Sequence, residues 1–271
     1  MQTTATTSLN RIRIGSVSYL NARPLIYGLA ERGVEGGNVE LALDVPSKLI
    51  NGLRDDRFDV ALLPVIDYQH LQGLRVIPAG GIGCDGATLT VRVFSQTPID
   101  RITSLACDPD SHTSVALAKI ILQRRYKIQP EFISLSAASN REGEARLLIG
   151  DKVVCEEPAG FEHQLDLGAA WKELTGLPFV FAVWVARQEV ALGDLPARLE
   201  QCKRAGLANV NELIRKFAIP RGWPAGLALQ YLTVYLKYDI GERQLEAMRT
   251  FHAMAAECGI IPSPARALVL A

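Results

Sequence analysis

The sequence has no excess of charge of either sign. Lysine and arginine together number 29, as do aspartate and glutamate, so the formal net charge of the 271 residues is zero. Proteins that bind nucleic acid or an anionic membrane surface usually carry a basic excess. We therefore expect a partner that is neither nucleic acid nor membrane.

Residues that would build a disulfide framework or a metal site are also few. The five cysteines are odd in number, none stands in Cys-x-x-Cys spacing, and the four histidines are scattered along the chain. Disulfide scaffolds and zinc sites need paired or closely spaced residues of these types. We expect reduced thiols and no bound metal.

Long apolar runs are absent as well. No stretch approaches the roughly 20 apolar residues of a membrane span. Residues 1–10 are polar and rich in threonine, unlike a secretory signal peptide. These features predict a cytoplasmic protein.

Motifs of covalent or nucleotide-dependent catalysis are missing too. There is no Gly-x-Ser-x-Gly elbow, and the segment Gly80–Gly86 lacks the Lys and Ser/Thr of a phosphate-binding loop. We interpret that segment as a turn on the hinge side of the molecule. An enzyme with this sequence is expected to work without metal, nicotinamide or covalent intermediate, so no cofactor is predicted.

What the sequence does contain is a regular alternation of strand and helix patterns. Over the first 70 residues, strands are expected at 11–14, 39–45 and 58–63, and helices from Pro24 and from Pro46. This order is typical of an α/β protein with an open, mostly parallel sheet covered by helices on both faces.

A second series follows. Further strands are expected over residues 74–79, 89–94, 104–107, 132–135, 146–149 and 179–186. Helices are expected over 115–126, over 171–175 before Gly176, and over 195–218, 224–236 and 242–258.

These patterns predict two α/β lobes joined by two crossovers, near residues 89–95 and 180–187. The first lobe is expected to comprise residues 1–92 and 186–271, and the second residues 93–185. Ligands of open α/β sheets bind outside the carboxyl ends of the strands. The binding site is therefore expected in the cleft between the lobes.

Two polar loops are candidates for ligand contacts. Residues 16–21 follow a strand and precede a helix, which suits an anion at a helix N-terminus, although a turn without ligand is equally compatible. In the loop 110–114, three hydroxyl groups surround His112, more than the single Ser or Thr that caps a helix. A carboxylate-binding role is favoured there. A role of His112 in catalysis and a capping role of Asp151 stay open.

Four stretches together resemble the MqnA/MqnD family of menaquinone biosynthesis, and within it the chorismate dehydratases. The resemblance covers essentially the whole chain. It rests on Arg13-Ile-Gly-Ser-Val-Ser-Tyr-Leu-Asn-Ala-Arg-Pro-Leu25, on Cys84-Asp-Gly86, on Ser111-His-Thr-Ser-Val115 with Ile149-Gly-Asp151, and on Thr175-Gly-Leu-Pro-Phe-Val-Phe-Ala-Val-Trp184.

The resemblance implies a periplasmic-binding-protein-like fold of the second type, and loss of water from chorismate to give 3-[(1-carboxyvinyl)oxy]benzoate. It implies catalytic roles for Asn21 and Thr90. The substrate-binding residues that it implies are Ser18, Tyr19, Thr88, Ser111, His112, Thr113, Ser114, Gly150 and Asp151. Two positions depart from the family pattern, because His112 stands where many relatives have Arg, and Thr90 where they have Ser.

Other functions remain open from sequence. A sibling enzyme of the same fold, 1,4-dihydroxy-6-naphthoate synthase, is the first alternative, and a non-enzymatic binding protein for small carboxylates is the second. The effector domain of a transcription regulator is disfavoured, because no DNA-binding module precedes residue 11. The protein is expected to be a monomer or a homodimer.

Overall fold

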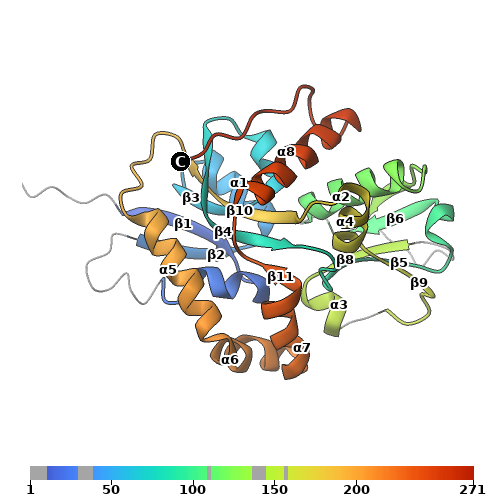
Figure 1. Ribbon diagram of the computed structural model, residues 1–271, viewed down its shortest axis with the longest axis horizontal. Coiled ribbons are helices and arrows are strands. Elements are labelled where there is room, and N and C mark those ends of the chain that lie inside the picture. Colours follow the sequence, from blue (N-terminus) through green and yellow to red (C-terminus); the bar gives the residue numbers. More distant parts are fainter. Residues whose placement is uncertain (1–10, 30–38, 109–110, 136–144, 156–157) are drawn as a thin grey trace, which may run out of the picture.

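The structure is a computed structural model that describes residues 11–29, 39–108, 111–135, 145–155 and 158–271. Residues 1–10 and Asp110, on which two of the expectations above depend, lie outside the described residues. Within these ranges the chain forms two β-sheets side by side, each covered by helices (Figure 1). The architecture is α/β, as predicted.

The first sheet contains six strands in the order β11-β4-β10-β3-β1-β2. Its strands are β1 (Ile12–Val17), β2 (Val39–Asp44), β3 (Val60–Pro64), β4 (Leu74–Cys84), β10 (Phe179–Arg187) and β11 (Leu236–Lys237). The predicted parallel pairing holds for β1 with β2 and β3, whereas β10 runs antiparallel to β3 and β4. All five residues of β3 are buried, as its continuous apolar run predicts.

The second sheet contains five strands in the order β7-β6-β8-β5-β9. Its strands are β5 (Val91–Ser95), β6 (Ser104–Cys107), β7 (Glu131–Ser134), β8 (Ala145–Ile149) and β9 (His163–Asp166). The apolar pattern did not predict β9, because its four residues His-Gln-Leu-Asp carry only one buried apolar side chain. Pairing with β5 makes it a strand.

Helices cover both sheets. The α-helices are α1 (Pro46–Arg54), α2 (His112–Arg124), α3 (Asp151–Cys155), α4 (Leu167–Thr175), α5 (Leu195–Ala208), α6 (Val210–Leu213), α7 (Ala225–Gln230) and α8 (Glu242–Glu257). Short 3₁₀ or π turns are η1 (Leu20–Ile26), η2 (Val65–His70), η3 (Ile99–Arg101), η4 (Ile214–Ala218), η5 (Ile219–Arg221) and η6 (Tyr231–Tyr235). Of the helices in the described ranges, none is both long and apolar enough to cross a bilayer.

Two expectations about the helices are wrong in detail. Pro24 lies inside the 3₁₀ turn η1 rather than at the start of an α-helix. The single helix expected over 195–218 is divided at Asn209 into α5, α6 and the π turn η4, and Asn209 hydrogen-bonds its side-chain amide to the carbonyl of Ala205. Asparagine competes with helical hydrogen bonding in this way, which apolar periodicity does not reveal.

The segment Gly80–Gly86 is not a turn between strands, because β4 continues through it to Cys84. A Cβ atom on Gly81 would lie 2.6 Å from the Ala182 carbonyl oxygen, and one on Gly83 would lie 2.6 Å from that of Phe179. Glycine at these positions lets β4 approach β10 closely where their pairing is irregular. The glycines of this segment therefore meet a requirement for close packing, and the predicted turn is wrong.

The chain passes to the second sheet after Cys84 and returns to the first at Phe179. The lobe limits 1–92 with 186–271 and 93–185 stay a proposal. Because β10 pairs along its length with strands of the first sheet, we favour an end of the second lobe before Phe179.

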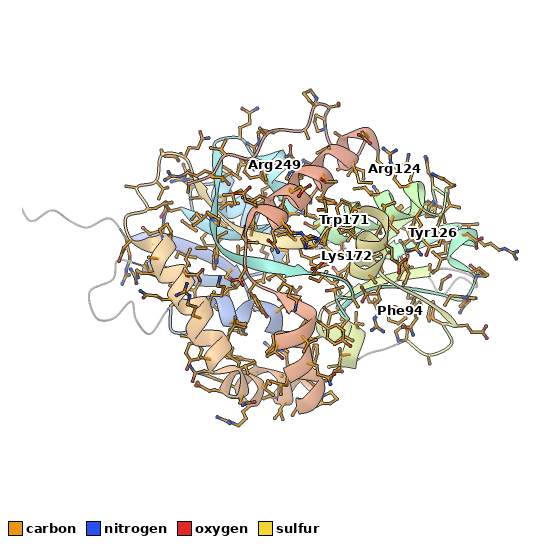
Figure 2. The ribbon with its side chains drawn as sticks, viewed as in Figure 1. Phe94, Arg124, Tyr126, Trp171, Lys172 and Arg249 are labelled. Carbon is orange, nitrogen blue, oxygen red and sulfur yellow. The ribbon has the colours of Figure 1, made fainter. Side chains whose placement is uncertain are left out.

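An aromatic cluster joins the lobes on the side of α4. Trp171 of α4 is fully buried, and its ring centroid lies 5.3 Å from that of Phe179 and 6.1 Å from that of Phe251 in α8. The Trp171 Nε1–H donates to the carbonyl of Pro178 at 2.9 Å. Figure 2 shows Trp171 near the middle of the molecule, between the two sheets. None of the five cysteines forms a disulfide bond in the structure.

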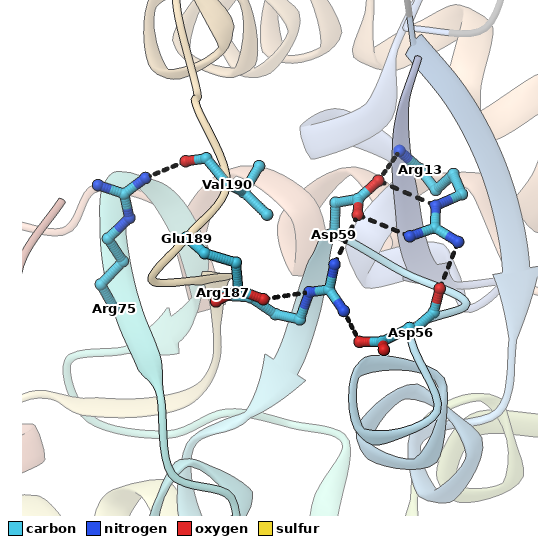
Figure 3. A network of polar contacts seen from close by, with 7 residues as sticks. All are labelled: Arg13, Asp56, Asp59, Arg75, Arg187, Glu189 and Val190. Carbon is cyan, nitrogen blue, oxygen red and sulfur yellow. Dashed lines mark hydrogen bonds and ion pairs between the residues drawn. The ribbon is translucent and has the colours of Figure 1, made fainter. Parts of the chain in front are cut away.

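A cluster of ion pairs fixes the opposite end of the first sheet (Figure 3). The Asp59 carboxylate accepts from the backbone N–H, Nε and Nη2 of Arg13 at 2.8, 3.0 and 2.7 Å, and from Nη2 of Arg187 at 3.2 Å. Burial raises the pKa of Asp59 and the Arg13 hydrogen bonds lower it, so that the net pKa is lowered. The cluster ties the start of β1 to the end of β10, away from the cleft.

We expect Asp59→Asn to lower the free energy of unfolding at pH 7 by about 3 kcal/mol, because two arginines lose their buried partner. The lowered pKa means that this contribution is present above the unfolded-state value of about 4 and is lost as the pH falls through the folded-state value. Urea unfolding of wild type and variant should therefore differ most at pH 7, with the gap narrowing below about pH 4. Asp100→Asn, at an exposed position in η3, is the control and should change little. A gap that widens on acidification would contradict this account.

Candidate functional site

A cavity of about 90 Å³ lies between the two sheets. The first sheet and its loops contribute Val17, Tyr19, Asn21, Pro46, Leu62, Pro64, Ile82, Phe181, Ala182 and Leu236. The second contributes Val91, Ile149 and Gly150 with the N-terminus of α2, and the chain between the sheets contributes Thr88 and Thr90. The cavity therefore stands at the carboxyl ends of β1 and β8, where the sequence predicted the cleft.

Nine of the eleven predicted site residues line this cavity, and two do not. Those that do are Tyr19, Asn21, Thr88, Thr90, Ser111, His112, Thr113, Ser114 and Gly150. Ser18 lies outside the lining, and its carbonyl accepts a hydrogen bond from Arg23. Asp151 also lies outside, and its Oδ1 accepts from Nε1 of Trp223 at 2.9 Å.

Thr90 and Asn21 both lie beside a third residue, Tyr231. The Tyr231 hydroxyl lies 2.8 Å from Oγ1 of Thr90, and the Asn21 side chain acts on the same hydroxyl by lowering its pKa. Tyr231 comes from η6, about 140 residues beyond Thr90. Burial raises its pKa well above the ordinary value for a phenol, so that it stays protonated across the physiological range.

Tyr231 is not among the site residues predicted from the sequence, and periodicity alone could not have identified it. It belongs to a helical run in which apolar and aromatic residues predict core packing. A π-helical turn starts at Tyr231, and such turns are frequent at functional sites. That signal exists only in the folded backbone.

The segment Thr88–Thr90 forms a tight turn that exposes its hydroxyl groups to the cavity. The Thr90 N–H donates to the Thr88 carbonyl at 2.8 Å, and Leu89 between them has a φ of 69°. A left-handed φ at a branched apolar residue costs on the order of 1–3 kcal/mol. Thr88 Oγ1 is buried without a partner among the described residues.

The Asp166 carboxylate holds this turn in place. It accepts from the backbone N–H of Thr88 at 3.0 and 3.1 Å, of Leu89 at 2.8 Å, and of Ala169 at 3.0 Å. The last bond caps the N-terminus of α4. One carboxylate therefore connects the strained turn of the cavity wall to the helix that packs between the lobes.

The N-terminus of α2 carries the hydroxyl-rich loop. Ser111 is the N-cap residue, yet its side chain makes no capping hydrogen bond. Thr113 Oγ1 accepts from the backbone N–H of Ile66 at 3.3 Å, a contact with the first lobe. Ser111, Thr113 and Ser114 are all buried. The N–H groups and dipole of the helix end favour an anion here.

His112 connects the same helix end to the first lobe. Its Nδ1 lies 2.9 and 3.0 Å from the carboxylate oxygens of Asp67, whose side chain is only 2% exposed. Asp67 lies on η2, directly after β3. Among the described residues that line the cavity, the titratable side chains are His112, Tyr19 and Tyr231, and no lysine or arginine is present.

The fold places the protein in a class. Over 95% of this chain it is similar to the periplasmic aliphatic sulphonate binding protein SsuA of Escherichia coli, with a TM-score of 0.68 at 13% identity and 90% of that chain covered. A protein of Archaeoglobus fulgidus gives a TM-score of 0.75 at 19% identity, over 93% of this chain and 98% of that one. The two sheets and the cavity between them thus define a periplasmic-binding-protein-like fold.

Sequence comparison then gives the family. Residues 12–257 match the family model described as menaquinone biosynthesis, and the chain belongs to that family. It is 32% identical over 248 residues to a protein of Campylobacter jejuni named chorismate dehydratase, covering 88% of this chain and 94% of that protein. It is 27% identical over 261 residues to a chorismate dehydratase of Thermus thermophilus, covering 88% and 93%.

Replacement of Asp166 tests the anchoring of the turn. We expect Asp166→Ala to lower the free energy of unfolding by about 2–4 kcal/mol, because three backbone N–H groups lose their acceptor. Thermal unfolding measures the effect. Asp194→Ala is the matched control, since Asp194 is the N-cap residue of α5 but makes no side-chain capping bond. Equal losses in the two variants would contradict an anchoring role of Asp166.

Proposed function

We propose that this protein is a chorismate dehydratase, a hydro-lyase that eliminates water from chorismate to give 3-[(1-carboxyvinyl)oxy]benzoate for menaquinone biosynthesis. The observation that carries the proposal is that Asn21 and Thr90 line the same cavity between the sheets in a chain from this family. The two named relatives support the substrate.

The elimination of water from chorismate requires only a few contributions from the protein. The electron pair of the C3–H bond forms the new C3=C4 bond, the C4 hydroxyl leaves with its electron pair, and the proton from C3 completes the water molecule. The ring becomes aromatic, which supplies the driving force. The protein has to orient the substrate, stabilise the departing oxygen and leave a base near C3.

Asn21 and Thr90 suit the departing hydroxyl. Oδ1 of Asn21 has no partner among the described residues, and a buried acceptor of this kind is costly unless a ligand satisfies it. Thr90 can donate a hydrogen bond to the oxygen as negative charge develops on it. Such donors are worth most in a dry, apolar site, and the lining here is largely aliphatic and aromatic.

The N-terminus of α2 suits a substrate carboxylate. We assign to Ser111, Thr113 and Ser114, with the N–H groups of the first helical turn, the binding of one of the two carboxylates. His112, where the family resemblance led us to expect Arg, can add positive charge when it is protonated beside Asp67. Gly150, with a φ of 63° and no side chain, leaves room on the opposite wall.

The base in this proposal belongs to the substrate. The enolpyruvyl carboxylate can reach the C3 proton of its own molecule, and no aspartate or glutamate is found among the described residues of the cavity lining. A site that holds the substrate in one conformation then supplies most of the rate enhancement through orientation.

Two further expectations remain proposals. A cytoplasmic location agrees with the proposed reaction. The protein is expected to act as a monomer or a homodimer, with chorismate as its small-molecule partner and neither nucleic acid nor membrane required.

Incubation of the purified protein with chorismate, without added metal or cofactor, should give the aromatic enolpyruvyl ether. Chromatography measures the amount of this product over time. Asn21→Ala should lower the rate by a factor of about 100 or more, because the leaving hydroxyl loses the acceptor that orients it. Calorimetry separates the alternatives. Chorismate that binds tightly and stays intact would indicate a binding protein. Chorismate that does not bind would favour the sibling naphthoate synthase.

The proposed base is tested by His112→Gln and Asp151→Asn. We expect each variant to retain at least about a tenth of wild-type turnover, because neither side chain accepts the C3 proton. Loss of a true general base lowers the rate by about 100-fold to 10,000-fold. Such a loss in either variant, with chorismate binding intact, would assign the base to that residue instead.

A further inference from the structure

Tyr231 lies beside the two residues to which the proposed function assigns the leaving hydroxyl. It is about 1% exposed, its hydroxyl lies 2.8 Å from Thr90 Oγ1, and the Asn21 side chain lowers the pKa of that hydroxyl. The family resemblance and the sequence patterns gave it no role. The three residues come from η1, from the chain between the sheets, and from η6, so that only folding brings them together.

The number of protons available on these groups indicates which of them donates each hydrogen bond and which accepts it. Thr90 Oγ1 is the hydrogen-bond partner of the buried Tyr231 hydroxyl in the described part of the protein. A phenol has one proton, and a buried proton of this kind needs an acceptor, so we assign Tyr231 as the donor to Thr90 Oγ1. The proton of Thr90 is left to point into the cavity, and Asn21 Oδ1 remains an acceptor there.

The Tyr231 ring is held so that its hydroxyl stays at this point. Trp223 stacks on it with ring centroids 5.0 Å apart and an interplanar angle of 24°. Trp223 in turn donates its Nε1–H to Asp151 at 2.9 Å, and Asp151 belongs to α3 behind the second sheet. This contact crosses between the lobes. It explains how Asp151 can matter to the site although it does not line the cavity.

We propose that Tyr231 is a positioning residue that orients the Thr90 hydroxyl as a hydrogen-bond donor toward the leaving hydroxyl of the substrate. The inference rests on the proposed function for its substrate. With this arrangement the substrate hydroxyl donates to Asn21 Oδ1, and its oxygen accepts from Thr90. The second bond strengthens as the C–O bond breaks, so the effect falls on turnover more than on binding.

Tyr231→Phe removes one oxygen atom and keeps the ring against Trp223. We expect kcat with chorismate to fall about 10-fold to 100-fold while KM changes less than about 3-fold, since Thr90 is then free to turn its proton toward Asn21 or other acceptors. Tyr238→Phe is the matched control. Tyr238 is also buried, but its hydroxyl has no described partner and it does not line the cavity. Its turnover should equal that of wild type.

A double variant separates positioning from a general structural effect. In a Thr90→Val background the hydroxyl to be oriented is gone, so adding Tyr231→Phe should lower kcat less than about 2-fold further. Full turnover in Tyr231→Phe would overturn the inference. So would a loss confined to KM, or an undiminished further loss in the Thr90→Val background.

The same pair of substitutions can be followed without catalysis. If the hydroxyls are hydrogen-bonded, the drop in unfolding temperature caused by Tyr231→Phe should be smaller in the Thr90→Val background than in wild type. Equal drops would contradict the contact itself. If wild-type protein forms no product from chorismate, the proposed function fails, and the unfolding comparison still decides whether the chain of hydroxyls exists.

Discussion

The carboxylate of Asp166 is the contact on which the cavity wall depends. The chain leaves the first sheet through a tight turn in which Leu89 has a left-handed backbone, a conformation that a branched residue does not keep unaided. Asp166 accepts from two N–H groups of that turn and from the first turn of α4. Because the turn presents Thr88 and Thr90, the placement of both hydroxyls follows from one charged acceptor that does not itself line the cavity.

Few charged side chains are found among the described residues that line the cavity. Its described lining is mostly apolar, and its polar atoms are hydroxyls, one amide, one imidazole and the N–H groups of a helix end. In such surroundings a hydrogen bond to a developing charge is stronger than in water, and an unsatisfied oxygen such as Asn21 Oδ1 is costly. A cluster of ion pairs in the first lobe instead surrounds Asp59, at the far end of the sheet. Stability and the proposed chemistry are thus separated along the same strands.

The sequence alone predicted a large part of the fold. Apolar alternation located β1 and β2, the continuous run located β3, and Gly176 marked the end of α4, where it has a φ of 73°. The sequence-based prediction was wrong or incomplete where contacts with residues distant in sequence determine the local structure. Gly81 and Gly83 are glycine because β10 lies too close for a side chain, and β9 is a strand because β5 pairs with it. Neither fact produces a local sequence pattern. The glycines contact residues about 100 positions further along the chain, and β9 depends on its pairing with β5.

The sequence by itself determined the class of fold, the family, and the loops that meet at the cleft, because strand ends, helix starts and hydroxyl-rich turns are written in short stretches of residues. Only the tertiary structure decided which side chains meet there. It placed Ser18 and Asp151 outside the cavity lining, paired His112 with the buried Asp67, and set Tyr231 between Asn21 and Thr90. A hydrogen bond forms only within about 3 Å, and for residues from three separate segments that distance is fixed by the packing of the two sheets.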